Sequence, residues 1–287
     1  MISIGNLAAG GRAKTPLAAL VAERLLAMGE RPAILSRGYG RRDRTDGVVV
    51  VRDPDGIRSD LDRAGDEPLM LARRLSGVSV VVSSSRYLAG VLAERHLGAT
   101  VHVLDDGFQH FDLHRDADIV AVAREDVEKA TTLPGGRLRE PLDAAHAADA
   151  FVTLDDDVRL EPGDRPRWRV TRRLGDVTGL DRSTPVVAVA GIAGPDRFFQ
   201  GLRAAGWTIA RELPFADHHH FSAADVARMF DTARATGAAG VITTEKDLVR
   251  LLPFRPFPLP VGFAPLVIEM ESPAEFDAWL RARVQTA

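Results

Sequence analysis

The stretch "IGNLAAGGRAKTP" carries the residue types that bind a nucleotide phosphate. An apolar run leads into a Gly-Gly turn, Lys14 and Thr15 follow, and an amphipathic segment begins directly afterwards. This order of strand, glycine loop, Lys-Thr and helix is typical of P-loop proteins. Backbone N–H groups from Gly10 to Thr15 could surround a β-phosphate, Lys14 could reach the β- and γ-oxygens, and Thr15 could bind Mg²⁺. The candidate loop comprises Ala8, Ala9, Gly10, Gly11, Arg12, Ala13, Lys14 and Thr15.

The spelling of this loop departs from the consensus at Ala8 and Ala13, where glycine is usual. A left-handed backbone at Ala13 would cost about 1–2 kcal/mol because of its Cβ, whereas a right-handed one would cost nothing. A glycine turn that simply enters an ordinary helix is the alternative interpretation.

A pair of acids follows a second apolar run, in "TVHVLDDGFQH". Asp105 and Asp106 would stand at the carboxyl end of a buried strand, where P-loop proteins hold Mg²⁺ directly or through water. Two adjacent carboxylates are costly without a cation nearby. Gln109 and His110 come just after the turn and could line the same site. The alternative is an aspartate-rich turn, which is common after strands.

Two further stretches offer groups for proton transfer. In "RAGDEPLMLARRL" Asp66 could be a general base for a substrate hydroxyl, although the local pattern favours a helix N-cap. "FADHHHFSAADV" contains Asp217 and three successive histidines, whose side chains alternate in direction in an extended segment and so suit one metal poorly. One histidine paired with a carboxylate is a better interpretation. Capping by Ser222 beside solvated histidines is the alternative, and a histidine-centred metallohydrolase is a third hypothesis.

Arginines recur where strands are expected to end. Arg37, Arg86, Arg137 and Arg139 could bind phosphate through two hydrogen bonds each, or could simply be solvated in a chain that is rich in arginine. The chain has only three lysines, Lys14, Lys129 and Lys246, so a lysine after the glycine turn suggests that a point charge is needed there. "TTEKDLVRL" predicts a turn from a strand into a helix.

The composition limits the class of protein. The 287 residues are 45% hydrophobic with a net charge of −3, which argues against a dedicated nucleic-acid binder. The chain has no cysteine, so disulfides and thiolate–metal sites are excluded and a reducing cytoplasm is the expected setting. No apolar run reaches the roughly 20 residues that span a bilayer, and we expect a soluble or peripheral protein without a signal peptide.

Strand-like runs alternate with helical patterns through the first half of the chain, which predicts an α/β fold with a mostly parallel sheet. Helices are expected at 15–28, 67–75 and 86–97. Residues 155–183 are charged and irregular, with a strand or hairpin in "RWRVTRRL", and a second α/β pattern follows. We therefore predict a P-loop NTPase-like nucleotide-binding domain at 1–164, a linker at 165–184, and a smaller α/β domain at 185–287 that closes the cleft. An antiparallel α+β domain is the alternative.

Taken in order, eight stretches resemble the tetraacyldisaccharide 4'-kinases of lipid A biosynthesis. They run from Ile4 to about Leu251 and are "IGNLAAGGRAKTP", "LSRGYGRR", "GDEPLMLARR", "DDGFQHFDLHRDADIV", "LPGGRLREP", "VAVAGIAGPDRFF", "FADHHHFS" and "TTEKDLVRL". The resemblance implies two α/β/α domains joined by a short strand linker, with the site in the cleft between them.

The resemblance also implies an activity and roles for residues. The γ-phosphoryl group of MgATP would pass to the 4'-hydroxyl of a tetraacylated glucosamine disaccharide 1-phosphate, giving lipid IVA. Lys14 and Thr15 would be the phosphate-loop pair, Asp105 and Asp106 the Mg²⁺-side carboxylates, and Gln109 and His110 would line the ATP site. Asp66 would be the base with His218 as its partner. Phosphates or substrate would contact Arg37, Arg86 and Arg139.

Two departures from the family pattern generate further expectations. Family members usually carry Gly-Gly-Thr/Ser-Gly-Lys-Thr, and Arg12 and Ala13 occupy the third and fourth of these positions here. A nucleotide-binding homologue with weak or lost kinase activity is therefore the alternative function. The family's N-terminal hydrophobic helix has no counterpart before the first strand: either the start of the chain is truncated or mis-assigned, or surface apolar residues provide peripheral docking at the cytoplasmic face of the bacterial inner membrane. The apolar stretch 251–266 is a candidate for that contact, and a packed loop is its alternative.

Overall fold

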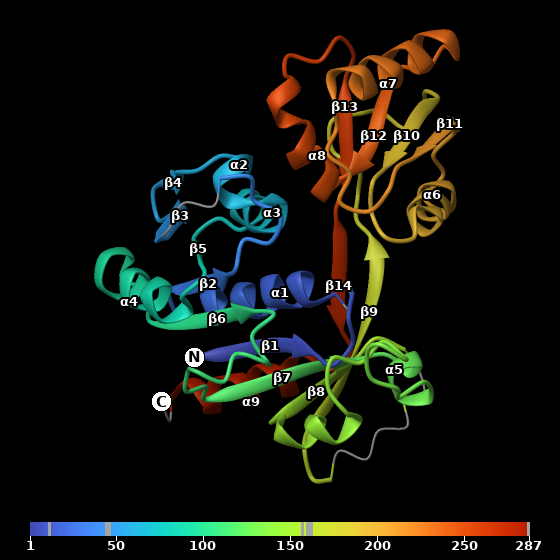
Figure 1. Ribbon diagram of the computed structural model, residues 1–287. Helices are drawn as coiled ribbons and strands as arrows, with labels where there is room; N and C mark the ends of the chain where they lie inside the picture. Colours follow the sequence, from blue (N-terminus) through green and yellow to red (C-terminus); the bar gives the residue numbers. More distant parts are fainter. Residues whose placement is uncertain (11–12, 44–46, 156–157, 159–162, 286–287) are drawn as a thin grey trace. The chain divides into compact units, whose positions relative to one another are not determined.

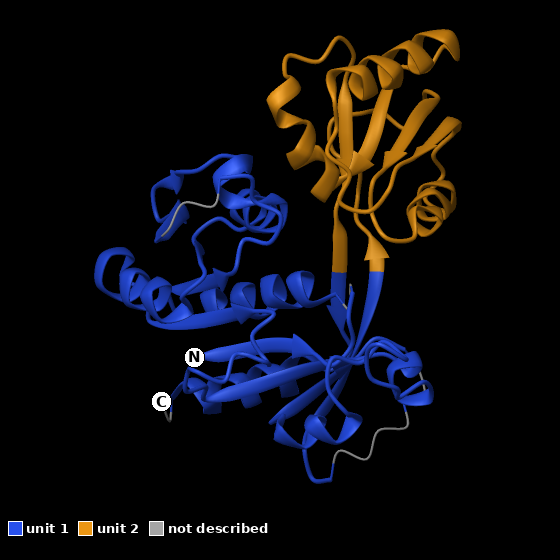
Figure 2. Ribbon diagram, in the orientation of Figure 1, with its two compact units in different colours: residues 1–172, 268–287 blue, residues 173–267 orange. Residues whose placement is uncertain are grey.

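The structure, a computed structural model, describes residues 1–10, 13–43, 47–155, 158 and 163–285 (Figure 1). The chain forms two compact units (Figure 2). Unit 1 comprises Met1–Arg172 and Ile268–Ala287, and unit 2 comprises Arg173–Val267. The chain passes between the units within two strands, which belong to unit 1 at one end and to unit 2 at the other.

Unit 1 begins with an alternation of strands and helices. Its elements are β1 (Ile2–Asn6), α1 (Lys14–Ala27), β2 (Pro32–Ser36), β3 (Val48–Asp53), β4 (Gly56–Ile57), α2 (Leu61–Ala64), α3 (Asp66–Arg74), β5 (Ser79–Ser83), α4 (Arg86–Leu97), β6 (Val101–Asp105), β7 (Ala117–Val122), α5 (Arg124–Glu128), the 3₁₀ helix η1 (Leu142–Ala147), β8 (Ala150–Thr153) and the strand β9 (Arg167–Leu174) that leads into unit 2. The three predicted helices are present, each within one residue of its expected start and end.

The strands of this unit belong to a ten-stranded sheet in the order β14-β9-β8-β7-β1-β6-β2-β5-β3-β4. From β9 to β5 the neighbours are parallel, whereas β3 pairs antiparallel with β5 and β4 with β3. Strands β1, β2 and β5 are buried at every position, as expected for apolar strands that are covered on both faces. Helix α1 packs on β1, β6 and β2, and α4 packs on β2 and β5.

Unit 2 is a smaller α/β unit. It contains β10 (Val186–Ala190), α6 (Pro195–Ala204), β11 (Ile209–Pro214), α7 (Ala223–Ala235), β12 (Gly240–Thr244), α8 (Glu245–Leu251), the 3₁₀ helix η2 (Leu252–Phe254) and β13 (Val261–Ala264). The four strands are parallel in the order β11-β10-β12-β13. Two apolar clusters, on α6 with Trp207 and on α7 with Phe221, cover the strands.

The end of the chain differs from the predicted domain limits. Strand β14 (Leu266–Met270) and helix α9 (Pro273–Gln285) return to unit 1, whereas the sequence pattern assigned 185–287 to the second domain. The reason is tertiary packing: Phe276 of α9 is fully buried and meets Trp168 edge to face, with 5.0 Å between ring centroids. Arg24 of α1 also donates to Asp277 at 3.1 Å. Local patterns do not reveal which sheet a terminal helix will cover.

Candidate nucleotide site

The loop between β1 and α1 is held in place by backbone contacts. The Ala9 N–H donates to the Arg137 carbonyl at 2.7 Å, the Arg139 N–H donates to the Leu7 carbonyl, and Ala8 forms a bridge with Leu138. The side chain of Asn6 donates to the Ala8 carbonyl at 2.8 Å. The segment around 137–139 therefore fixes the start of the loop. Gly11 and Arg12, which the sequence placed in the phosphate loop, lie outside the described residues.

Ala13 adopts the left-handed conformation, with φ 56° and ψ 27°, immediately before α1. The expected penalty for a Cβ at this position therefore applies. Gly10 also has a positive φ of 98°. The loop thus keeps a left-handed step where a glycine is usual, although alanine occupies it.

Lys14 is the first residue of α1, and its side chain contacts residues at the ends of β1 and β6. Its Nζ atom is 2.9 Å from Asn6 Oδ1 and 3.0 Å from Asp106 Oδ1. Arg139 reaches the same two residues, with Nη2 2.7 Å from Asn6 Oδ1 and 2.9 Å from Asp106 Oδ1. Burial alone raises the pKa of Asp106, but hydrogen bonding to Arg139 and the charge of Lys14 outweigh it and lower that pKa. Sequence reasoning missed Asn6, whose only signal is its position at the end of β1.

Thr15 contacts Asp105, the other carboxylate of the acidic pair. Its Oγ1 atom lies 3.2 Å from Asp105 Oδ2 and 3.2 Å from Glu67 Oε2. Asp105 is 5% exposed, and burial, followed by the charges of Glu67 and Asp106, raises its pKa to about 7. The predicted metal group of Thr15, Asp105 and Asp106 is thus brought to one edge of the sheet, and Glu67 is an addition that the sequence reasoning did not find. Its signal was its place in the first turn of α3, beside Asp66.

Asp66 is the first residue of α3 and is buried. The N-cap is Gly65, with φ 86°, so the favoured expectation that Asp66 caps this helix is wrong by one position. A side chain could not replace Gly65 without strain, because a Cβ there would lie 3.0 Å from the Tyr39 carbonyl oxygen. The Oδ1 atom of Asp66 accepts a hydrogen bond from the Glu67 N–H at 2.9 Å. Glu67 links this helix start to Thr15.

Four polar residues follow the neighbouring strands. Arg86 is buried, donates to the Ser83 carbonyl at 2.9 Å, and has its pKa lowered to about 10 by burial and by the charge of Arg37. Burial and the charge of Arg86 also lower the pKa of His110. Gln109 donates to the Asn6 carbonyl at 3.0 Å, and its Oε1 atom is buried with no hydrogen-bond partner among the described residues. Arg137 pairs with Glu125 at 2.8 Å instead.

The residues of this edge fit a metal-bound triphosphate. Lys14, Arg139, Arg86 and Arg37 supply positive charge, and Asp105 with Thr15 supplies oxygen ligands of the kind that Mg²⁺ prefers. Nowhere in the described part of the chain do three or more His, Asp or Glu side chains gather as a metal site by themselves. A magnesium ion held here would therefore complete its ligands with waters and phosphate oxygens, as in nucleotide sites.

His218 belongs to unit 2. It has a positive φ of 56°, and its ring nitrogens approach Lys246 Nζ at 3.3 Å and Arg250 Nη2 at 3.4 Å. Its neighbour His219 instead contacts Asp225 Oδ2 at 3.0 Å. Ser222 caps α7, as the alternative interpretation expected. The histidines have different partners, which does not favour the metallohydrolase hypothesis.

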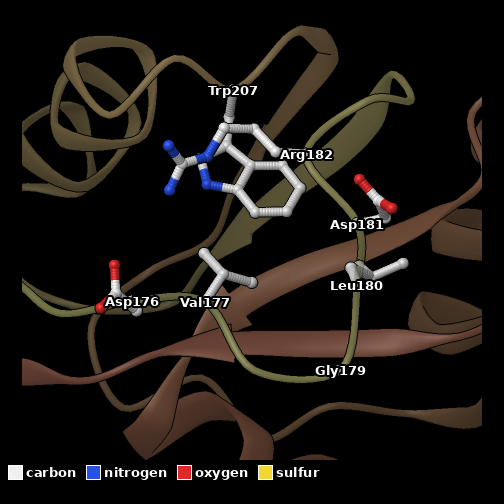
Figure 3. A pocket seen from close by; sticks show the side chains of 7 residues that line it. All are labelled: Asp176, Val177, Gly179, Leu180, Asp181, Arg182 and Trp207. Atoms are coloured by element: carbon white, nitrogen blue, oxygen red, sulfur yellow. The ribbon is translucent and has the colours of Figure 1, made fainter.

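Two other features of unit 2 lie outside these groups. An open surface pocket of about 680 Å³ is lined by residues of the connection before β10 and by Trp207, and no predicted site residue lines it (Figure 3). In the segment 251–266, Phe254, Phe257, Leu259 and Val261 pack against the apolar cluster of α7. This packing favours the alternative that the segment is a packed loop. No helix in the described ranges combines the length and the hydropathy that crossing a bilayer requires.

Comparison with known proteins decides the family. Residues 1–285 match the family described as tetraacyldisaccharide-1-P 4'-kinase. This chain belongs to that family. The protein named tetraacyldisaccharide 4'-kinase in Koribacter versatilis is 40% identical over 260 residues, covering 88% of this chain and 78% of the relative. The relative of the same name in Geobacter sulfurreducens is 38% identical over 294 residues, covering 98% and 82%.

A crystal structure of a family member shows the same fold. The LpxK protein of Aquifex aeolicus, solved in complex with ATP, aligns with a TM-score of 0.80 and 29% identity over 99% of this chain and 87% of its own. The predicted α/β class, with a large mostly parallel sheet and a second smaller sheet, is therefore confirmed.

Proposed function

We propose that this protein transfers the γ-phosphoryl group of ATP to the 4'-hydroxyl of a tetraacyldisaccharide 1-phosphate, which yields lipid IVA. Family membership supports the kinase activity, and the name of the family gives the acceptor. Two contacts at the ends of β1 and β6 support the assignment of this activity to particular residues. Lys14 contacts Asp106, and Thr15 contacts Asp105.

In the proposed reaction, Lys14 leaves its contact with Asp106 to bind the β- and γ-phosphates, and loop N–H groups bind the β-phosphate. Thr15, Asp105 and Asp106 would hold Mg²⁺, which when bound would supply neutralisation of the charge on the phosphate oxygens. Gln109 and His110 line the nucleotide site. Positioning and charge neutralisation, rather than covalent chemistry, supply the catalysis.

The acceptor side of the reaction needs a base. Asp66 takes the proton of the 4'-hydroxyl, with His218 as its partner, while the sugar oxygen forms a bond to the γ-phosphorus and the bond to the ADP oxygen breaks. Arg37, Arg86 and Arg139 bind phosphates of the nucleotide or of the lipid through paired hydrogen bonds. We place the protein at the cytoplasmic face of the bacterial inner membrane as a peripheral enzyme, with ATP and a membrane lipid as its partners and no nucleic-acid or protein partner.

Transfer of label from γ-labelled ATP to the purified lipid disaccharide tests the proposal. We expect transfer by the wild-type protein, and losses of at least about a hundredfold in kcat for Lys14→Ala and Asp66→Asn. Lys129→Ala is the matched control, because Lys129 is exposed and pairs with Glu125, four residues earlier in the chain. Full activity in both site variants would refute the mechanism. Binding of MgATP without transfer to this lipid would support the alternative of a homologue with lost kinase activity.

A further inference from the structure

The start of α8 in unit 2 contains a buried ion pair. Asp247 is fully buried, and its Oδ1 atom accepts a hydrogen bond from Arg250 Nη1 at 2.8 Å. The other oxygen accepts from the Gly191 N–H at 2.9 Å and from the Thr244 hydroxyl at 2.8 Å. Arg250, only 5% exposed, also donates to the Gly191 carbonyl at 2.8 Å. These bonds lock the guanidinium group between the carboxyl ends of β10 and β12.

This edge is where an open parallel sheet usually binds its ligand. Strand β10 connects through α6 to β11 on one side, and β12 lies on the other side, so the chain reverses its direction of winding between β10 and β12. A buried charge pair used only for stability brings little net gain over apolar packing. Its position at the switch point suggests that the guanidinium group is held for another purpose.

The guanidinium group of Arg250 contacts the ring of His218. Lys246 and Arg250 are four residues apart on α8 and therefore share a face of the helix. Lys246 Nζ lies 3.3 Å from Nε2 of His218, and Arg250 Nη2 lies 3.4 Å from Nδ1. The ring is thus bracketed at both nitrogens by side chains of one helix, although His218 itself lies in a loop with a left-handed backbone.

The chemistry of these contacts restricts the imidazole. A guanidinium group has no acceptor, and a neutral imidazole has one acceptor nitrogen. Lys246 and Arg250 are both donors, so only one of them can donate to a neutral ring: a bond from Arg250 to Nδ1 leaves the hydrogen on Nε2, and a bond from Lys246 to Nε2 leaves it on Nδ1. The Oδ1 atom of Asp217 lies 4.0 Å from Nε2. The two side chains of α8 therefore fix the plane of the ring, whichever of them donates to it.

We propose that Lys246 and Arg250 are positioning residues for His218, and that Asp247 acts through Arg250 by fixing its guanidinium group. The proposal rests on the proposed function, in which His218 is the partner of the base. It adds a device by which the fold of unit 2 orients that histidine.

A double-mutant cycle on kcat tests the coupling. We expect Lys246→Met and Arg250→Lys each to lower kcat about ten- to a hundredfold with little change in the KM for ATP, because the phosphate loop of unit 1 is untouched. In a His218→Ala background the same substitutions should lower kcat by less than about twofold, because their effect passes through the missing ring. Arg234→Met is the matched control, since Arg234 also pairs with an aspartate three residues away but is exposed.

A second readout does not depend on the kinase reaction. Ring ¹⁵N chemical shifts of labelled histidines, with His218 assigned by its Ala variant, should show one dominant tautomer in the full chain and a changed ratio of tautomers in Arg250→Lys. Lys246→Met, which replaces a half-exposed residue, keeps the test valid if the buried Arg250 variant does not fold: it should shift the Nε2 resonance.

The outcomes separate this inference from the proposed function. Undiminished activity in His218→Ala would remove the role of His218 from the proposed function. A low kcat in His218→Ala with normal kcat in both α8 variants, or with equal losses in the presence and absence of the ring, would overturn the positioning role alone. A His218 resonance that is averaged between tautomers in the wild-type protein would overturn it as well.

Discussion

Asp105 and Asp106 are neighbours in the chain, yet their surroundings shift their pKa values in opposite directions. Asp106 contacts Lys14 and Arg139, which lower its pKa against the effect of burial. Asp105 is buried beside Glu67, and its pKa rises to about 7. Two carboxylates with different environments have different tasks. Asp106 already contacts two cations, whereas Asp105 is buried close to the like charge of Glu67, which a divalent cation at this edge would compensate.

The raised pKa of Asp105 predicts how stability depends on pH without metal or nucleotide. Between about pH 4 and pH 7 the folded state holds a proton that the unfolded state has lost, so this carboxyl makes the protein less stable as pH rises through that window. Asp105→Asn removes the effect. Relative to wild type, the variant should therefore gain about 2–4 kcal/mol in unfolding free energy between pH 5 and pH 8. Urea denaturation at both pH values measures this, and a pH-independent difference would contradict it.

The left-handed backbone of Ala13 predicts a stabilising substitution. Ala13→Gly relieves the Cβ strain at φ 56°, so we expect a gain of about 0.5–1 kcal/mol after the greater chain entropy of unfolded glycine is subtracted. Ala123→Gly is the control, because Ala123 also precedes a helix but has φ −105° and should lose stability. Thermal unfolding of the wild-type protein and both variants measures these changes in stability. An Ala13→Gly protein that is less stable than wild type would show that this backbone is not left-handed in solution.

At the scale of the elements, the site depends on how closely β1 approaches the turn after β6. A Cβ on Gly5 would lie 2.3 Å from the Cβ atom of Phe108, and the Gly107 N–H donates to the Ile4 carbonyl at 2.9 Å. Gly5 therefore lets the turn that carries Gln109 and His110 lie against the strand that carries Asn6. This close approach brings the predicted phosphate loop and the acidic pair together.

Gly5→Ala should separate these elements. We expect a loss of about 2–4 kcal/mol in unfolding free energy and weaker ATP binding, because Phe108 must move together with Gln109. Gly135→Ala serves as the control, since its nearest non-neighbouring atom would be 3.5 Å from the new Cβ and its φ is not positive. Denaturation and nucleotide titration measure the two effects. Wild-type stability in Gly5→Ala would show that the turn does not pack as described.

The parts of the site that could be predicted from the sequence are those whose residues are close together in the chain. Strand, loop and helix around Lys14, and the acids after an apolar strand, follow from short-range patterns, and parallel pairing brings their ends to one edge. Glu67 could not be chosen, because only the packing of α3 brings it within 3.2 Å of Thr15. The bracket around His218 was equally hidden: "EKDLVR" predicts a helix start, but the contact with a loop 28 and 32 residues earlier is tertiary. The prediction that Asp66 caps α3 was wrong because Gly65, which can adopt φ 86°, takes the N-cap position.

At the scale of the whole molecule, unit 2 is an insertion into unit 1. It is one continuous segment, Arg173–Val267, whereas unit 1 is completed only when β14 and α9 return. Helix α9 supplies Phe276 and Leu280, both fully buried, and burying such side chains contributes about 2–5 kcal/mol each. The first 172 residues therefore lack part of their core until the last 20 residues have been made.

This arrangement predicts different behaviour for two fragments. Residues 173–267 should fold alone with a cooperative thermal transition, because their four-stranded sheet and both apolar clusters are contained in the segment. Residues 1–172 should be unfolded or molten, because Trp168 loses its contact with Phe276. Circular dichroism and the fluorescence of Trp207, the one tryptophan between 173 and 267, measure the first fragment, and that of Trp168 measures the second. Adding a peptide of residues 266–285 should restore structure to the second fragment. A stable 1–172 fragment that does not respond to the peptide would show that α9 is not part of the core of unit 1.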